Sequence, residues 1–220
     1  MIIASSWVFS WTLLYFKVNI FIFYILMSLR LPHYLLIIYL ILFIICAINP
    51  HDRAVRWAEN IPVMITVILL VITYKKFQFS NTAYVFMSLW IFMHTIGGHY
   101  TFERVPFEWF SNLFWFERNM YDRIAHYIIG FYAYPLIEYL DHKQLVNKSW
   151  VMYCFGVFAI FTLASVYEII ERWYAATAWW EQWIAFLGSQ WDIWDAQKDM
   201  LADGLGAITS AVVYWIQKRV

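Results

Sequence analysis

The stretch SWVMYCFGVFAIFTLASVYEII, residues 149–170, decides the fold class of this chain. It carries no charged side chain before Glu168, and it is long enough to cross the hydrocarbon core of a bilayer, which takes about 20 apolar residues. Backbone groups in lipid must be hydrogen-bonded internally, and a single run of this kind satisfies them as an α-helix. The stretch therefore predicts a membrane-spanning helix that ends in acidic residues.

Other apolar runs flank this stretch and are separated by polar connections. They cover residues 7–29, 34–49, 60–74, 82–98, 121–140 and 197–217. Together with the run at 149–172 they predict an all-α fold, a polytopic transmembrane bundle of six or seven spans. Lys17 interrupts the run at 7–29, so we treat residues 1–31 as an extra N-terminal hydrophobic helix and 32–220 as the membrane domain.

The composition of the chain excludes several classes of protein. Hydrophobic residues make up 63% of the sequence and charged residues 14%, whereas a soluble domain carries about 25% charged residues. The formal net charge is zero, so no basic surface is expected for binding nucleic acid. The partners expected from the composition are membrane lipids.

Acidic residues gather at one end of the predicted bundle. If successive spans alternate in direction, every acidic residue except Glu138 and Asp141 falls at the end with the connections 99–120 and 173–196. Lys and Arg are shared evenly between the ends, but those at the opposite end lie in short connections with few acidic neighbours. We therefore place that opposite end in the cytoplasm and the acidic end at the outer face of a bacterial inner membrane. Most tryptophans also fall at the acidic end, which is typical of side chains at headgroup depth.

Several polar side chains at the acidic end share a helix face by their spacing. They are Asp122 with His126, Glu168 with Glu171, and the ladder Asp195, Asp199 and Asp203, while His94 ends the run at 82–98. A charged group at membrane depth costs at least about 2.5–3.5 kcal/mol, so these groups should face the interior of the bundle and have partners there. The sequence therefore predicts a polar site at the acidic end.

Carboxylates combined with imidazoles are the ligands expected for Mg²⁺, Mn²⁺ or Zn²⁺. The metal ligands expected from this pattern are His94, Asp122, His126, Glu168 and Asp199, and the catalytic groups expected are Asp122, His126, Glu168, Glu171 and Asp199. A bound metal would polarise a phosphoryl or carbonyl oxygen, and Arg118 or Arg123 would hold a phosphate. The chain contains no H-E-x-x-H, Walker or G-x-S-x-G motif, so the pattern locates a site without fixing a reaction.

Each of these side chains also has an ordinary structural interpretation. His94 could bond a backbone carbonyl at the end of its helix. Glu168 and Glu171 could pair with Arg172, Arg118 or Arg123. The spacing alone does not choose between these interpretations.

Five segments of the chain carry a resemblance to a known family. They are NPHDRAVRWAENI (49–61), MHTIGGHYTFERVPF (93–107), ERNMYDRIAHYIIGF (117–131), YEIIERW (167–173) and WDIWDAQKDM (191–200). Over about residues 32–217 the chain resembles the YjdF family of bacterial inner-membrane proteins, a domain of unknown function, which implies a core of six spans. Asp203 and the extra N-terminal helix depart from the family pattern. The order D-x₃-H, glutamate-bearing helix end and D-x₃-D is also similar to VanZ-like proteins, which implies a cell-envelope setting.

Three functions remain compatible with the sequence. The first is a metal-assisted intramembrane enzyme that acts on a lipid or a lipid-linked cell-envelope substrate. The second is a proton-coupled transporter, although carriers place their sites near the midplane and this cluster lies at one end. The third is a non-catalytic membrane protein whose polar groups hold helices together, as interhelical hydrogen bonds do.

Overall fold

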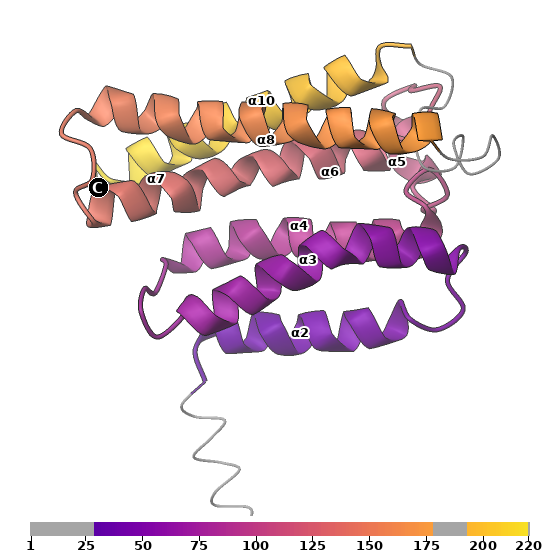
Figure 1. Ribbon diagram of the computed structural model, residues 1–220, viewed down its shortest axis with the longest axis horizontal. Coiled ribbons are helices and arrows are strands. Elements are labelled where there is room, and N and C mark those ends of the chain that lie inside the picture. The colour runs from indigo at the N-terminus through magenta and orange to yellow at the C-terminus, as the bar shows by residue number, and fades with distance from the viewer. Residues whose placement is uncertain (1–28, 178–192, 220) are drawn as a thin grey trace, which may run out of the picture.

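The computed structural model describes residues 29–177 and 193–219 of the chain, and within those ranges it contains helices and no strands (Figure 1). The run at 7–29 predicted as an extra helix lies outside the described residues. So does most of the 173–196 connection. The prediction of an all-α fold is confirmed for the part that is described.

The helices follow one another along the chain with short connections. They are α2 (Leu31–Ile45), α3 (Arg53–Thr73), α4 (Asn81–Tyr100), α5 (Glu108–Leu113), α6 (Tyr121–Ile129), the 3-10 helix η1 (Gly130–Tyr132), α7 (Ala133–His142), α8 (Ser149–Thr177) and α10 (Asp195–Gln217). Because α6, η1 and α7 follow without a break, they form one helical segment that corresponds to the predicted run at 121–140. Each of the six predicted runs after the first thus corresponds to a helical segment.

Two of the described helices have the length and apolar composition needed to cross a membrane, namely Arg53–Thr73 and Ser149–Trp173. Helix α2 is apolar but has only 15 residues. Helices α4 and α10 are 20 and 23 residues long, but they carry polar side chains along buried faces. Interior helices of a membrane bundle do not need an apolar surface all round, because neighbouring helices and not lipid cover them.

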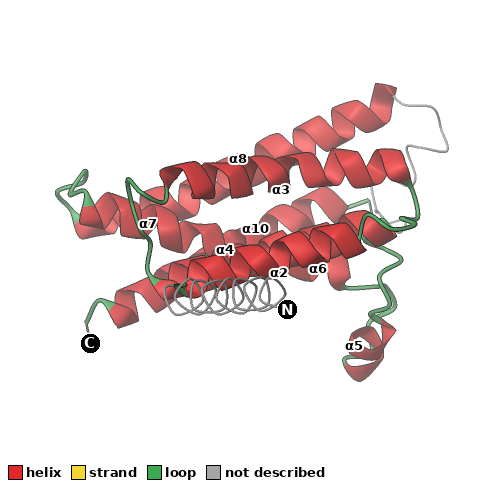
Figure 2. Ribbon diagram, turned by 90° about the horizontal axis from the view of Figure 1, so that it is seen from below, coloured by secondary structure: helices red, strands yellow, loops and turns green. Residues whose placement is uncertain are grey.

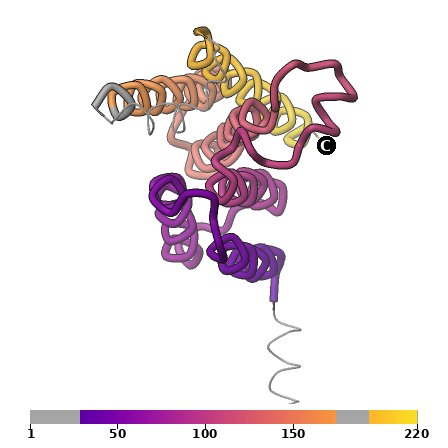
Figure 3. The backbone as a smooth tube through the Cα atoms, turned by 90° about the vertical axis from the view of Figure 1, so that its right-hand side faces the viewer, coloured from indigo at the N-terminus to yellow at the C-terminus, as the bar shows by residue number. Residues whose placement is uncertain are grey.

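Helix α4 lies in the middle of the bundle. It packs against α2 and α3 on one side and against α6 and η1 on the other, while α10 packs against α6, η1, α7 and α8. Seen along the bundle, α2 and α3 form one half and α8 and α10 lie in the other (Figure 3). The core includes Val63 and Ile137, both fully buried.

The outer faces of the bundle are apolar and uncovered. Exposed side chains on three helices include Ile41 and Ile44 of α2, Ile65, Ile68 and Ile72 of α3, and Phe155, Phe158 and Leu163 of α8. Apolar surface of this extent is not tolerated in water, but it is what a helix needs where it faces lipid. At one end of the bundle, exposed tryptophans include Trp57, Trp109, Trp115 and Trp173.

Helix α3 begins earlier than the apolar run at 60–74 predicted. The carboxylate of Asp52 caps it by accepting hydrogen bonds from the backbone N–H groups of Ala54 and Val55, at 2.7 and 3.0 Å. This first part of the helix is polar, and it buries Glu59 and Asn60 inside the bundle. The earlier start of α3 therefore places Glu59, which precedes the predicted run, inside the bundle.

Two glycines set the distance between α10 and the segment containing α6 and η1. A Cβ atom on Gly206 would collide with the carbonyl oxygen of Tyr127, and one on Gly130 would collide with the carbonyl oxygen of Asp203. Only glycine permits so close an approach of the two backbones. The acidic first half of α10 is thereby held against α6.

Candidate functional site

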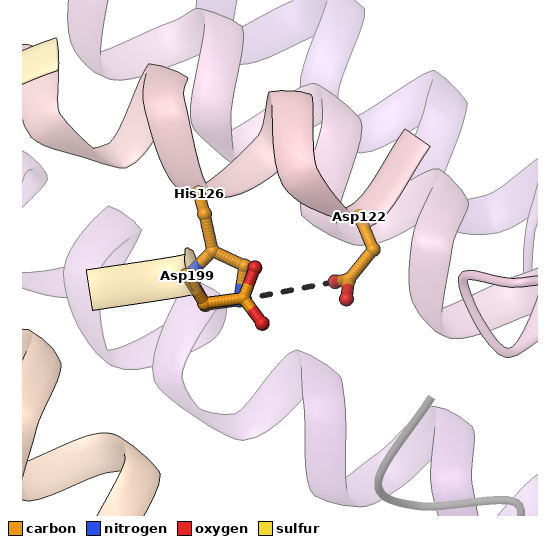
Figure 4. A group of neighbouring side chains, drawn as sticks. All are labelled: Asp122, His126 and Asp199. Carbon is orange, nitrogen blue, oxygen red and sulfur yellow. Dashed lines mark ion pairs between the residues drawn. The ribbon is translucent and has the colours of Figure 1, made fainter. Parts of the chain in front are cut away.

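Three side chains from the facing ends of α6 and α10 form what we call the candidate cation site: Asp122, His126 and Asp199 (Figure 4). The Nε2 atom of His126 lies 3.8 Å from Oδ1 of Asp122 and 3.8 Å from Oδ1 of Asp199. One potential ligand atom from each residue lies within 4.8 Å of the others. Asp122 and His126 are one helical turn apart on α6, and the packing of α10 brings Asp199 to them.

These separations are too long for hydrogen bonds, which have donor–acceptor distances up to about 3.2 Å. They are close to the separation of two ligands on one ion, since ligand distances of about 2.0–2.6 Å put neighbouring ligand atoms roughly 3–4 Å apart. The three side chains therefore have the chemical type and the spacing of cation ligands, and Asp199 also accepts a hydrogen bond from Arg123.

Asp203 fixes the orientation of the His126 ring. It is fully buried one turn beyond Asp199, and both of its carboxylate oxygens lie 3.3 Å from Nδ1 of His126. A carboxylate at this position accepts the Nδ1–H hydrogen bond, which leaves the lone pair of Nε2 directed at Asp122 and Asp199. Asp203 was not among the metal ligands or catalytic groups predicted from the sequence, although its i+4 spacing from Asp199 was a usable signal.

Two arginines bind the acidic residues at the start of α10. The guanidinium groups of Arg118 and Arg123 each donate to Oδ1 of Asp195 at 2.6 Å, and Arg123 also donates to Oδ1 of Asp199 at 2.6 Å. Burial lowers the pKa of Arg118, but the hydrogen bond and charge of Asp195 outweigh it, so the pKa is raised above its ordinary value. Both arginines predicted to hold a phosphate are thus bonded to carboxylates in this structure.

Helix α8 brings Glu168 and Glu171 toward the same end of the bundle. The Glu168 carboxyl is buried, and its Oε1 atom has no hydrogen-bond partner among the described residues. It interacts electrostatically with His126 and Asp122, and Glu171 interacts with Glu168, His126 and Asp122. Neither glutamate belongs to the group of three ligand atoms, so both border the candidate cation site without being part of it.

His94 lies apart from this site. Its Nε2 atom is 3.1 Å from Oε2 of Glu59, and its ring contacts Trp90 and Phe102 at centroid distances of 4.8 and 5.0 Å. The structure therefore does not bring His94 into the candidate cation site, where the sequence analysis had placed it. Its partner Glu59 was missed because the sequence was interpreted as polar connection up to residue 59.

Carboxyl groups outnumber arginine side chains around the candidate cation site. The carboxylates near it belong to Asp122, Asp195, Asp199, Asp203 and Glu168, and the guanidinium groups that pair with them belong to Arg118 and Arg123. Buried carboxylates without a compensating charge are costly. A bound divalent cation would remove most of that cost.

The comparisons with known proteins agree with the resemblance noted in the sequence. Residues 31–219 match the family described as "Predicted membrane protein (DUF2238)". The chain belongs to this family. It is 30% identical to the inner membrane protein YjdF of Escherichia coli (strain K12) over 178 residues, which cover 78% of this chain and 83% of that relative. No solved structure matches the chain.

Membership of the DUF2238 family confirms that the chain is a membrane protein. The family match begins at the first residue of α2 and includes every described helix. The candidate cation site, its arginines and the buried Glu59 all lie inside the matched region. This DUF2238 protein therefore carries its polar interior within the family domain.

Proposed function

We propose that this DUF2238 protein binds a divalent cation through Asp122, His126 and Asp199 and uses it to act on an anionic lipid or lipid-linked cell-envelope substrate. The observation that supports this proposal is the set of three ligand atoms within 4.8 Å of one another, contributed by two helices. The buried Asp203 carboxylate, which orients His126, is a second support because metal-binding histidines commonly have such a partner.

The position of the site favours a substrate with its polar group at the membrane surface. The three ligands lie in the first two turns of α6 and α10, at the end of the bundle where Trp109, Trp115 and Trp173 are exposed. A cation there would polarise a phosphoryl or carbonyl oxygen of a headgroup and lower the pKa of a bound water. Arg118 and Arg123 would hold Asp195 and Asp199 of α10 in place. The negatively charged group of the substrate would bind to the cation.

The test is the metal content and Mn²⁺ affinity of the purified protein, measured by elemental analysis and electron paramagnetic resonance. We expect stoichiometric Mn²⁺ binding by the wild type and its loss in Asp122→Asn, His126→Gln and Asp199→Asn. Asp141→Asn is the matched control, because Asp141 is a carboxylate at the opposite end of the bundle that bonds Tyr214 and Lys218. Wild-type protein that binds neither Mn²⁺, Mg²⁺ nor Zn²⁺ would refute the proposal.

A structural role for the cluster is the second candidate, and the ion pairs of Asp195 favour it. Asp195 is the first residue of α10. It binds Arg123 of α6 and Arg118, which lies in the connection before α6. These bonds join three segments whether or not a cation is present. If this were the only role, Asp195→Asn would lower thermal stability while Asp122→Asn would change neither stability nor cellular phenotype.

A further inference from the structure

The connection between α4 and α6 carries a continuous set of exposed apolar side chains. Its residues 107–116, which we call the aromatic segment, include the short helix α5 and six aromatic side chains. The exposed apolar side chains of this segment are Trp109, Leu113, Phe114, Trp115 and Phe116, and that of Trp115 is 90% exposed. An apolar surface of this kind marks a site of interaction with another surface.

Helix α5 is amphipathic although it has only six residues. Trp109 and Leu113 are one turn apart and form an exposed apolar stripe. Glu108 and Asn112, also one turn apart, form an exposed polar stripe beside it. Ser111, on the face opposite the apolar stripe, is buried. The helix therefore turns one face to the protein and shows separate apolar and polar faces outward, as a helix in a membrane surface does.

Contacts at its base fix the aromatic segment to the start of α6. The side-chain amide of Asn119 donates to the carbonyl oxygens of Glu103 and Val105, at 3.0 and 2.7 Å. The side-chain oxygen of Asn119 accepts from the backbone N–H of Tyr121, the first residue of α6, at 2.9 Å. The Phe107 ring packs edge-on against the Tyr121 ring, with 5.4 Å between centroids. The place of the segment is therefore tied to the place where α6 begins.

The aromatic segment projects sideways from the bundle. Seen along the bundle, the connection between α4 and α6 reaches beyond the outline that the helices form (Figure 3). In Figure 2, α5 lies to the side of the bundle near the end where α6 begins. What surrounds a membrane bundle on its sides is lipid, so a segment that projects sideways near the helix ends lies at the depth of the lipid headgroups.

We infer that the aromatic segment lies in the headgroup layer of the membrane beside the bundle and anchors the start of α6 there. The stripe of Trp109 and Leu113 faces the acyl chains, and that of Glu108 and Asn112 faces water. Trp and Phe are the side chains suited to this depth, and the uncovered apolar faces of α3 and α8 already require lipid around the bundle. The headgroup layer also contains water, so side chains at this depth meet both. The anchor does not depend on a bound cation.

Lipid photolabelling tests the anchor in the wild-type protein. Protein in lipid nanodiscs is illuminated with a phospholipid that carries a diazirine on its acyl chain close to the headgroup. Trypsin then releases residues 105–118 as one peptide, because Arg104 and Arg118 bound it. We expect lipid adducts on this peptide, and fewer when the diazirine is at the far end of the acyl chain. The peptide of residues 149–172, which contains most of α8, should show the opposite preference.

Spin labels compare the two stripes of α5 directly. Leu113→Cys and Asn112→Cys each carry a nitroxide in a full-length background with Cys46 and Cys154 replaced. Electron paramagnetic resonance measures how readily oxygen, which favours lipid, and a water-soluble nickel complex reach each label. The ratio of oxygen to nickel accessibility should be about twofold or more higher at Leu113 than at Asn112. Leu163→Cys on α8 is the lipid reference, since its native side chain is 62% exposed, as Leu113 is.

Two results of the spin-label experiment overturn the anchor. Equal ratios at Leu113 and Asn112 show that both stripes meet the same medium. Low accessibility of the Leu113 label to both reagents shows that protein and not lipid covers the apolar stripe. Spin–spin broadening that disappears on dilution with unlabelled protein then identifies a second copy as the cover. Photolabelling requires no substitution, and a 105–118 peptide without lipid adducts overturns the anchor even if the cysteine variants do not fold.

Discussion

At the scale of single residues, the orientation of the His126 ring depends on a neighbour one helix away. Asp203 receives the Nδ1–H group, and Nε2 points to the two carboxylates of the candidate cation site. The sequence predicted that Asp122, His126 and Asp199 belong to one site, and the structure brings these three side chains together. The partnership of His126 with Asp203 could not be identified, because it depends on how closely α10 approaches α6.

Replacing Asp203 by Ala should weaken Mn²⁺ binding roughly 10–100-fold, the usual effect of removing the partner of a metal-binding histidine. Without the carboxylate, the proton of the neutral His126 ring can move from Nδ1 to Nε2. The Nε2 lone pair is then no longer available to bind the ion. Titration followed by electron paramagnetic resonance measures the affinity. Ser210→Ala is a control at another buried polar side chain of α10. Unchanged affinity in Asp203→Ala would show that Asp203 does not orient the ligand.

If a cation binds at the candidate cation site, Arg123 competes with it for Oδ1 of Asp199. Replacing Arg123 by Gln should lower the stability of the metal-free protein by about 3–5 kcal/mol, because Asp195 and Asp199 then lose a charged partner inside the bundle. Added Mn²⁺ should restore more thermal stability in this variant than in wild type, since Asp199 is free to bind the ion. Thermal unfolding with and without Mn²⁺ provides the measurement. Equal Mn²⁺ stabilisation of variant and wild type would contradict the competition.

The pairing of Glu59 with His94 was not predicted, and the reason is physical. Glu59 and His94 are both buried at the meeting of α3 and α4, and Gly98 permits that meeting because a Cβ there would press on Asn60 and Glu59. Spacing along one helix cannot show which side chains of two different helices meet. His94 was therefore predicted as a site residue without its neighbour Glu59, which lies 3.1 Å away.

At the scale of elements, the apolar runs predicted six helical segments and left the short helix α5 unrecognised. Helix α5 has only six residues and lies off the end of the bundle (Figure 2). The start of α3 was placed too late because its first turns are polar and become buried only through contact with α4. Length and hydropathy define the lipid-facing parts of helices well, and they define the polar ends poorly.

The close approach of α6 and α10 should depend on Gly206 more than on Gly204. Gly206→Ala places a methyl group against the Tyr127 backbone, which cannot move aside, so stability should fall by about 1–3 kcal/mol and Mn²⁺ binding should weaken. Gly204→Ala is the matched control on the same helix, because its new methyl group would meet the Phe161 ring, which can rotate away. Thermal unfolding and Mn²⁺ titration of both variants test this. A smaller effect at Gly206 than at Gly204 would contradict the packing argument.

At the scale of the whole molecule, the connections divide between two ends. The 74–80 and 143–148 connections lie at the same end as the C-terminus, and the 46–52 and 101–120 connections lie at the other (Figure 1). The alternation predicted from the sequence gives the same division. The number of spans and the direction of the bundle in the membrane remain predictions.

Cysteine labelling of intact cells should distinguish the two ends. In a background with Cys46 and Cys154 replaced, a cysteine at Leu113 should react with a membrane-impermeant maleimide, and one at Leu145 should react only after the cells are opened. Both positions are well exposed, at 62% and 61%. The expectation follows from the unpaired basic residues of the 143–148 connection, which favour the cytoplasm. Labelling in the reverse order would move the candidate cation site to the cytoplasmic face.

The 3-10 turn η1 is the point at which the segment from α6 to α7 is anchored to α10. Gly130 packs directly against the backbone of α10, so the helical segment is anchored at this turn. The nine residues of α6 extend from the anchored turn toward the 101–120 connection. Asp122 lies farther along α6 from Gly130 than His126 does, so a small rotation of α6 about Gly130 would displace the carboxylate more than the imidazole. Any displacement of the start of α6, where the 101–120 connection joins it, would therefore change the distance from Asp122 to Asp199 more than the distance from His126 to Asp199.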